Sequence, residues 1–238
     1  MNPSTRSRLL LAINIVLFVV VLSIVAKEKY WQKASQLVTG QMTPAAETQH
    51  YLTMTGIHRR PIAQALAGSD VQIAFIGDSI IEGWLTSAVV PNSMNLGIGR
   101  DTIPGLIART DVELVQHVPV WYVGIGINDT IRNRDADLIQ GFVEDIFRLY
   151  GPAKKLIWRA ALPVAFLDTE REQFRKELNS QTQAACSQIP HCTFLAAPRE
   201  YADNVSAWTS DGLHPNAEGY RALTDQLCQI VTCLSVGP

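Results

Sequence analysis

The sequence predicts an α/β protein: a three-layer α/β/α sandwich around a five-stranded parallel sheet, preceded by an N-terminal transmembrane helix. Short apolar segments alternate with helical stretches along most of the chain, which is typical of a parallel sheet covered by helices on both faces. The chain has 238 residues, 47% of them hydrophobic, so it is long enough for one well-buried domain and short for two. Its first 26 residues differ from the rest because they contain one long apolar run.

The apolar run covers residues 9–26 and has only two polar members. A helix of that length spans roughly 27 Å, close to the roughly 30 Å of a bilayer's hydrocarbon core. Tyr30 and Trp31 follow it, as expected for an interfacial anchor. A buried soluble helix and a cleaved signal peptide are the alternatives, but Ile24 stands where a signal peptide needs a small residue. The predicted organisation is a cytoplasmic stub and transmembrane anchor over 1–26, a linker over 27–44 and a folded domain over 45–238.

Five apolar segments have the length of buried strands, and helices are expected between them. The predicted strands are at 71–76, around 94–96, and at 121–125, 156–160 and 193–195. The predicted helices are near 80–86, 103–117, 135–150, 168–188 and 216–231. Asp168 stands before an acidic first turn, and Pro215 occupies the expected first position of the last helix.

The charges are nearly balanced, with 20 Lys+Arg against 22 Asp+Glu. Proteins that bind nucleic acids normally have an excess of basic residues, so this balance argues against a nucleic-acid partner. Four of the five histidines, His50, His58, His117 and His191, lack the spacing of metal ligands. We therefore expect neither a metal nor another cofactor.

The four cysteines fall into two close groups, Cys186 with Cys192 and Cys228 with Cys233. Neither spacing is that of a zinc site or a Cys-x-x-Cys redox site. The spacings are consistent with one or two disulfides and also with four buried thiols. The sequence does not choose among the three possible ways of pairing four cysteines. The basic residues around the anchor do not decide its orientation. Disulfides would favour a periplasmic or other extracytoplasmic location for the folded domain.

Two of four notable short segments follow the first two predicted strands. In Gly77-Asp78-Ser79-Ile80, the serine lies at a strand-to-helix turn, where free backbone N–H groups can stabilise an oxyanion. The alternative is that Ser79 only caps the helix. The second segment, residues 95–102 (NLGIGRDT), contains two glycines that let backbone N–H groups approach a ligand. It lacks the third glycine of a dinucleotide-binding loop.

The other two segments supply a neutral amide and an acid–base pair. Asn128, in Gly126-Ile127-Asn128-Asp129, can donate to developing negative charge without titrating, although a loop asparagine is the simpler interpretation. Asp211 stands three residues before His214, so its carboxylate can bind Nδ1–H and leave the other nitrogen basic. With Ser79 they would complete a nucleophilic triad. The alternative is that Asp211 caps a turn and His214 lies on the surface.

Taken together and in this order, the segments GDSI, NLGIG, GIND and DGLHPN resemble the blocks of the SGNH (GDSL-type) hydrolase family. The resemblance covers roughly 71–231 and is strongest to platelet-activating-factor acetylhydrolase-like esterases and carbohydrate O-acetylesterases. It implies a flavodoxin-like fold, with Ser79 as nucleophile, His214 as general base and acid, and Asp211 as its orienter. It also implies an oxyanion hole built from the N–H groups of Ser79 and Gly97 and the Asn128 side chain. Ile80 replaces the leucine of the family name.

The resemblance implies a serine esterase that removes short acyl groups, such as acetyl groups on an envelope or extracellular carbohydrate. A lysophospholipase, an acyl-thioesterase, a membrane-anchored O-acetyltransferase and a non-catalytic binding module are the alternatives. The candidate substrate-binding residues are Trp84, Arg100, Phe166 and Trp208, for each of which packing is an alternative role. Arg100 stands where relatives often have a small residue, and it would either favour an anionic substrate or pair with Asp101. The sequence leaves the oligomeric state open.

Overall fold

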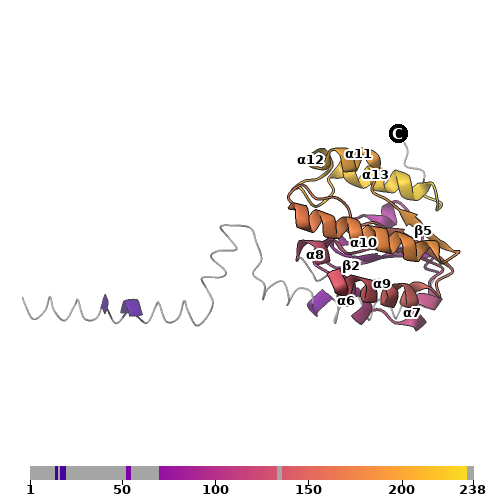
Figure 1. Ribbon diagram of the computed structural model, residues 1–238, viewed down its shortest axis with the longest axis horizontal. Coiled ribbons are helices and arrows are strands. Elements are labelled where there is room, and N and C mark those ends of the chain that lie inside the picture. Colours follow the sequence, from indigo (N-terminus) through magenta and orange to yellow (C-terminus); the bar gives the residue numbers. More distant parts are fainter. Residues whose placement is uncertain (1–13, 16, 20–51, 55–69, 133–135, 235–238) are drawn as a thin grey trace, which may run out of the picture. The chain divides into compact units, whose positions relative to one another are not determined.

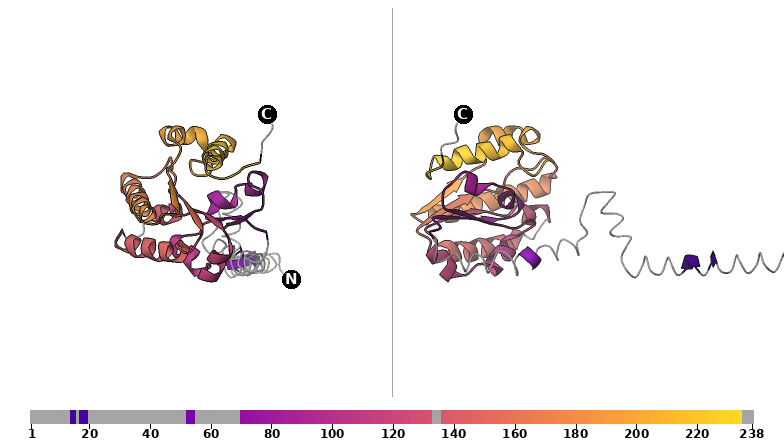
Figure 2. Two further views of the ribbon diagram at one scale, coloured as in Figure 1. Left: turned by 90° about the vertical axis from the view of Figure 1, so that its right-hand side faces the viewer. Right: turned by 180° about the vertical axis from the view of Figure 1, so that it is seen from behind.

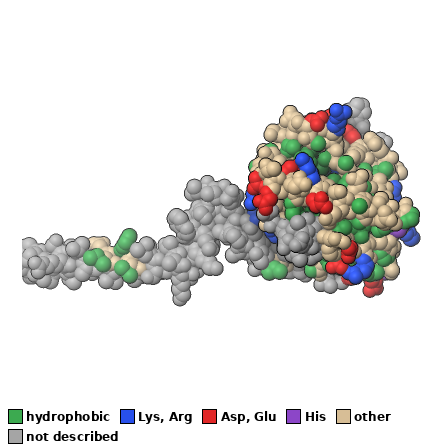
Figure 3. Space-filling model, in the orientation of Figure 1, with side chains coloured by type: hydrophobic (Ala, Val, Ile, Leu, Met, Phe, Trp, Pro, Cys, Tyr) green, Lys and Arg blue, Asp and Glu red, His purple; other side chains and the backbone are tan. Residues whose placement is uncertain are grey.

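The structure is a computed structural model that describes residues 14–15, 17–19, 52–54, 70–132 and 136–234, apart from the side chains of 136–139 and 142. The sheet and the helices around it belong to one unit of the chain, Tyr51–Pro238 (Figure 1). On the face that Figure 3 shows, basic and acidic side chains of this unit are intermingled.

A five-stranded parallel sheet forms the centre of the unit, with the strand order β2-β1-β3-β4-β5. The strands are β1 (Ile73–Gly77), β2 (Ser93–Gly97), β3 (Val120–Gly124), β4 (Lys155–Arg159) and β5 (Cys192–Leu195). This order is that of flavodoxin-like folds, in which ligands bind beyond the carboxyl ends of the strands. All five predicted strands are confirmed to within a few residues. Gly77 pairs with both Gly97 and Gly124, so three strands end at the same edge.

Helices cover both faces of the sheet, which confirms the sandwich (Figures 1 and 2). One face packs on α6 (Ile103–Ala108), α7 (Val112–His117), α9 (Ala136–Tyr150) and α10 (Thr169–Ser187). The other face packs on α5 (Ser79–Glu82), α11 (Arg199–Asp203), α12 (Val205–Trp208) and α13 (Ala217–Cys228). The short helices η2 (Thr86–Ala88) and α8 (Ile127–Ile131) complete the connections. Alternation along β1 produces the two cores, because Phe75 and Ile76 enter opposite clusters.

Helix boundaries differ from the prediction where side chains cap the backbone. The single helix expected over 103–117 is two helices, because the Asp111 carboxylate accepts from Leu114 N–H at 2.8 Å and begins α7. Asp168 caps α10 as predicted. Pro215 is not helical: it forms a bridge with Thr209, and Asn216 caps α13 by accepting from Gly219 N–H at 3.0 Å.

The cysteines form two disulfides, Cys186–Cys192 and Cys228–Cys233. The first joins the last turn of α10 to the start of β5, and the second fixes the end of α13 to the segment that follows it. The disulfide interpretation is therefore confirmed, and the alternative of four buried thiols is wrong.

The predicted anchor, residues 9–26, lies outside the described residues apart from 14–15 and 17–19, which are helical. None of the helices formed by described residues combines the length and the apolar composition needed to cross a bilayer. The predicted linker, 27–44, also lies outside the described residues.

Candidate active site

Ser79 begins α5 immediately beyond the carboxyl end of β1. Gly77 ends the strand at φ +157°, and a Cβ there would lie 1.9 Å from the carbonyl oxygen of Gly124, so only glycine fits. Asp78 then caps α5 by accepting from Ile80 N–H at 3.0 Å. Ser79 is consequently the first residue of the helix, and its N–H is one of the first-turn donors that have no partner within the helix.

His214 and Asp211 reach Ser79 from a tight loop before α13. The Nε2 atom of His214 lies 2.9 Å from Ser79 Oγ, and its Nδ1 atom lies 2.7 Å from Asp211 Oδ2. The other carboxylate oxygen of Asp211 accepts from the backbone N–H groups of Leu213 and His214 at 3.0 and 2.7 Å. The structure therefore brings together the three side chains that the sequence singled out.

The loop geometry orients the carboxylate. Gly212 adopts φ +84°, a left-handed conformation that suits glycine, and its carbonyl accepts from Ala165 N–H at 2.9 Å. Ser210 N–H donates to the His214 carbonyl at 2.8 Å and closes the turn. These bonds hold the imidazole at the sheet edge although its side chain is 40% exposed.

Asp211 is held in its ionised form. Partial burial alone would raise the pKa of its carboxyl, but hydrogen bonds from the His214 side chain, from His214 N–H and from Leu213 N–H outweigh that effect. The pKa of Asp211 is consequently lowered from 3.8 to about 2. An ionised acceptor at Nδ1 favours the tautomer in which Nε2 can take a proton from Ser79.

Two of the three predicted oxyanion donors fit the geometry. Asn128, on α8, donates one Nδ2 hydrogen to the Asp101 carbonyl at 2.9 Å, and this bond leaves its second N–H for a ligand. The Ser79 N–H is available at the helix start. Gly97 differs, because its N–H donates to Asn95 Oδ1 at 2.8 Å. A Cβ on Gly97 would lie 2.2 Å from Glu82 N, so this glycine lets α5 pack against β2 and the structure does not support an oxyanion role for it.

The candidate substrate-binding residues occupy different environments. Trp84 is buried and contacts the rings of Phe75 and Tyr122, with centroids 5.6 and 5.5 Å away, so it is a core residue. Trp208 is half-buried, and it packs against the core cluster on the same face of the sheet. The alternative of packing therefore applies to both tryptophans.

Phe166 and Arg100 lie on the surface near the catalytic loops. Phe166 is 56% exposed, and a Cβ on Gly212 would lie 3.4 Å from its ring. Arg100 is exposed and adopts φ +67°, while the carboxylate of Asp101 beside it forms a buried ion pair with Arg109 at 2.7 Å. The Arg109 guanidinium also donates to the carbonyls of Leu96 and Gly77, so Arg109 holds the loop after β2 against the nucleophile turn.

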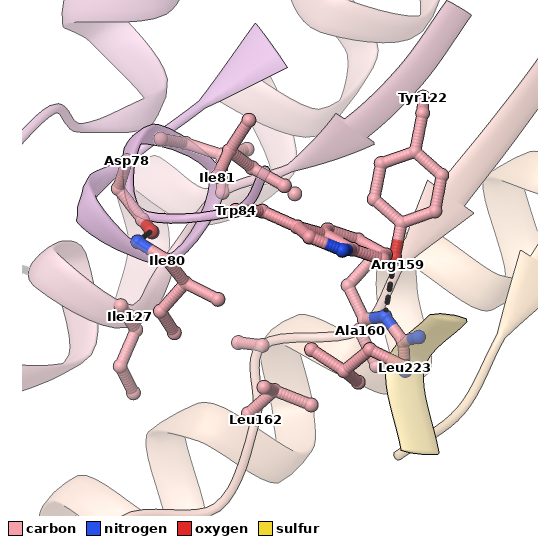
Figure 4. A pocket seen from close by; sticks show the side chains of 13 residues that line it. Asp78, Ile80, Ile81, Trp84, Tyr122, Ile127, Arg159, Ala160, Leu162 and Leu223 are labelled. Carbon is pink, nitrogen blue, oxygen red and sulfur yellow. Dashed lines mark hydrogen bonds between the residues drawn. The ribbon is translucent and has the colours of Figure 1, made fainter. Parts of the chain in front are cut away.

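A cavity of about 20 Å³ lies behind the nucleophile turn (Figure 4). Neighbours of the site in the sequence line it: Asp78 and Ile80 flank Ser79, and Ile127 precedes Asn128. At the other end, Arg159 donates to the Tyr122 hydroxyl at 2.8 Å. The volume suits one water molecule or one methyl group.

Asn95, the first residue of the segment NLGIGRDT, is a positioning residue whose role the sequence alone did not indicate. Its amide donates to the carbonyls of Ile81 and Trp84 at 2.6 and 2.9 Å and accepts from Gly97 N–H. The sequence signal for this role was a polar side chain within a mostly apolar predicted strand, because a buried amide needs hydrogen-bond partners. In the part of the chain that the structure describes, no group of three or more His, Cys, Asp or Glu side chains could hold a metal ion.

Comparison with known proteins identifies the family. The model of the GDSL-like lipase/acylhydrolase family matches residues 75–222, which include all four segments. No curated protein is similar enough to count as a match.

Several solved structures share the fold. A candidate platelet activating factor from Streptococcus pneumonia is 20% identical, with a TM-score of 0.62 over 83% of this chain and 97% of that chain. An acetylxylan esterase from Geobacillus stearothermophilus is 20% identical, with a TM-score of 0.56 over 68% and 94% of the two chains. A GDSL-like lipase from Bacteroides thetaiotaomicron is 21% identical, with a TM-score of 0.55 over 71% and 95%. The chain therefore belongs to the GDSL-like lipase/acylhydrolase family and is a serine hydrolase of the SGNH type.

Proposed function

We propose that the protein is a serine esterase that removes short acyl groups, foremost acetyl groups from a carbohydrate, through a Ser79–His214–Asp211 triad. The single observation that carries this proposal is the continuous pair of hydrogen-bond distances, 2.9 Å from Ser79 Oγ to His214 Nε2 and 2.7 Å from His214 Nδ1 to Asp211. This is the arrangement of a nucleophile, its base and the group that orients the base.

Each of the four residues has a defined role in the proposed mechanism. Ser79 Oγ attacks the ester carbonyl while His214 Nε2 accepts its proton, and ionised Asp211 stabilises the resulting imidazolium. The Ser79 N–H and the Asn128 amide donate to the oxyanion of the tetrahedral intermediate. His214 then protonates the departing alcohol, and a water molecule activated by the same imidazole hydrolyses the acyl-enzyme.

The small cavity supports a short acyl group. Its lining includes Asp78, Ile80 and Ile127, the sequence neighbours of Ser79 and Asn128, and we propose that the acyl substituent of the bound ester enters it. With room for about one methyl group, it accommodates acetyl and not a long chain. The acetylxylan esterase from Geobacillus stearothermophilus, a mutant of which is named as an acetyl-xylooligosaccharide esterase, favours a carbohydrate ester as the natural substrate.

Hydrolysis of p-nitrophenyl acetate and p-nitrophenyl decanoate tests the acyl preference, with Ser79→Ala as the control. We expect the acetate to have the higher kcat/KM. A large preference for the decanoate would refute the acetyl assignment and favour a lysophospholipase or acyl-thioesterase. Product analysis with an acceptor sugar present distinguishes hydrolysis from O-acetyl transfer, because a transferase would yield the acetylated sugar in place of free acetate.

The proposal includes a single-pass anchor over residues 9–26 and an extracytoplasmic hydrolase domain. The apolar run supports the anchor, together with Ile15, Leu17, Phe18 and Val19, which are helical and more than half exposed. The two disulfides support the oxidising side of the membrane. After a carbonate wash of membranes from expressing cells, the full chain is expected in the pellet and a chain lacking residues 1–26 in the supernatant. A full chain found in the wash would refute the anchor.

A further inference from the structure

The nucleophile helix is held by backbone hydrogen bonds and by side chains from other elements. The Ser79 and Ile81 carbonyls of α5 accept from the N–H groups of Gly83 and Trp84, at 3.0 and 3.1 Å. The Tyr220 hydroxyl donates to the Ile80 carbonyl at 3.0 Å. Asn95 donates to the Ile81 carbonyl from the opposite side, on β2. The turn that carries Ser79 is thus fixed between a strand and α13.

Tyr220 belongs to the helix that continues from the histidine loop. It lies in the first turn of α13, where its N–H donates to the Asn216 carbonyl, two residues after His214. One turn further on, Thr224 accepts from the Trp84 indole N–H at 3.2 Å. Helix α13 therefore binds the nucleophile segment at two points on one face.

The local packing leaves a place for the phenol. Gly83 ends α5, and a Cβ there would lie 2.7 Å from the Tyr220 hydroxyl oxygen, so a larger residue would displace it. The ring packs beside Trp84, with centroids 6.1 Å apart. Burial, together with the nearby groups of Asp78 and Tyr201, raises the pKa of Tyr220, so its hydroxyl is protonated at neutral pH and can donate.

We infer that Tyr220 is a positioning residue: its hydrogen bond to Ile80 fixes α5 against α13 and thereby sets the distance between Ser79 and His214. The two residues lie 135 positions apart in the sequence, and the imidazole is partly exposed, so core packing alone does not align them. Displacements of about 1 Å between reacting groups can cost about 100-fold in rate. The catalytic consequence of this inference rests on the proposed function.

Tyr220→Phe tests the inference, since it removes the hydroxyl and keeps the ring. With p-nitrophenyl acetate we expect kcat to fall about tenfold and KM to stay within about twofold. The rate at which a fluorophosphonate modifies Ser79 should fall in the same proportion. In a crystal structure of the variant, the Ser79 Oγ to His214 Nε2 distance should exceed about 3.5 Å, beyond hydrogen-bonding range.

Tyr150→Phe is the matched control. Tyr150 is also buried, and its hydroxyl lies 3.2 Å from Thr110 Oγ1 on the other face of the sheet, so its loss should lower the melting temperature without changing kcat or labelling. If Tyr220→Phe behaves like Tyr150→Phe, with stability lowered and kcat, labelling and the Ser79–His214 distance unchanged, Tyr220 is only structural and the inference is wrong. If the wild type neither hydrolyses the ester nor reacts with the fluorophosphonate, the proposed function fails instead, and the crystallographic distance alone decides the inference.

Discussion

The Nε2 atom of His214 lies 2.9 Å from the hydroxyl oxygen of Ser79, although 135 residues separate them in the sequence. The serine follows β1 and the histidine precedes α13, so the sheet edge and the last helix must both form before the two side chains meet. Catalysis by Ser79 and His214 therefore requires that both the sheet and the last helix of the hydrolase unit are folded.

Replacing Ser79 by alanine should abolish esterase activity while the protein stays folded. Loss of the nucleophile of a triad typically costs about 10⁴-fold or more in kcat. Ser187→Ala, at an exposed position at the end of α10, serves as the control and should retain full activity. The measurements are p-nitrophenyl acetate hydrolysis and thermal melting, and substantial turnover by Ser79→Ala would exclude Ser79 as the nucleophile.

Asp211→Asn should reduce kcat about 10²- to 10⁴-fold, because a neutral amide neither stabilises the imidazolium nor enforces the correct tautomer. Since the pKa of Asp211 is about 2, its carboxylate remains ionised throughout the pH range above about 4. The wild-type rate should therefore show no loss from Asp211 protonation in that range. Asp168→Asn, which removes a charge from the cap of α10 and leaves a side chain that can still accept from Arg171 N–H, is the control. Equal kcat for Asp211→Asn and the wild type would remove Asp211 from the triad.

Asn128→Ala should lower kcat about 10²- to 10³-fold with little change in KM, as expected when a donor acts mainly on the transition state. The control is Asn204→Ala, since Asn204 only caps α12. A variant in which KM rises and kcat is unchanged would show that Asn128 binds the ground state and does not stabilise an oxyanion.

Asp78→Asn should change how stability depends on pH. Burial, opposed by the hydrogen bond from Ile80 N–H and by Arg109 and reinforced by Asp101 and Asp129, raises the pKa of Asp78 from 3.8 to about 7. Between these values the folded chain keeps a proton that the unfolded chain has lost, so this group makes stability fall as pH rises from about 4 to about 7, and its effect is constant above that.

Asparagine still accepts from Ile80 N–H and does not titrate, so the pH-dependent loss due to residue 78 should be absent in the variant. Urea unfolding of both proteins between pH 4 and 8 measures this effect, with the exposed Asp70→Asn as a reference. Parallel stability profiles for the wild type and Asp78→Asn would show that the carboxyl of Asp78 titrates normally.

Removing the first disulfide by replacing Cys186 and Cys192 with serine should lower the free energy of unfolding by roughly 2 kcal/mol, the chain-entropy value for such a short loop. The disulfide lies at the amino end of β5, away from Ser79, so kcat should be unchanged in the folded variant. Urea unfolding with and without a reductant measures the difference, and a reductant that leaves the wild type unaffected would contradict a stabilising role.

Local pattern predicted the strands well because they are short and mostly apolar, and because β1, β3 and β4 are almost fully buried. It also placed Ser79, Asn128, Asp211 and His214 at one edge, since segments that follow parallel strands share that edge. The sequence pattern wrongly indicated that the Gly97 N–H was available for an oxyanion. In the folded chain this N–H donates to the Asn95 side chain, whose position depends on the packing of α5.

Long-range contacts explain the other differences. Trp84 lies five residues after Ser79 and was a candidate for the substrate surface, but α5 ends after one turn and directs the indole into the core. The role of Arg109 depends on Asp101, Leu96 and Gly77, which only the folded chain brings together. Tyr220 likewise has no local signal, because its partner is 140 residues away.

Covalent labelling of the purified chain with a fluorophosphonate, followed by peptide mass spectrometry, is the decisive experiment for Ser79 as a nucleophile activated by His214. We expect one adduct, on Ser79, that does not form in His214→Ala. An unmodified Ser79, or an adduct at another serine that persists in His214→Ala, would contradict it.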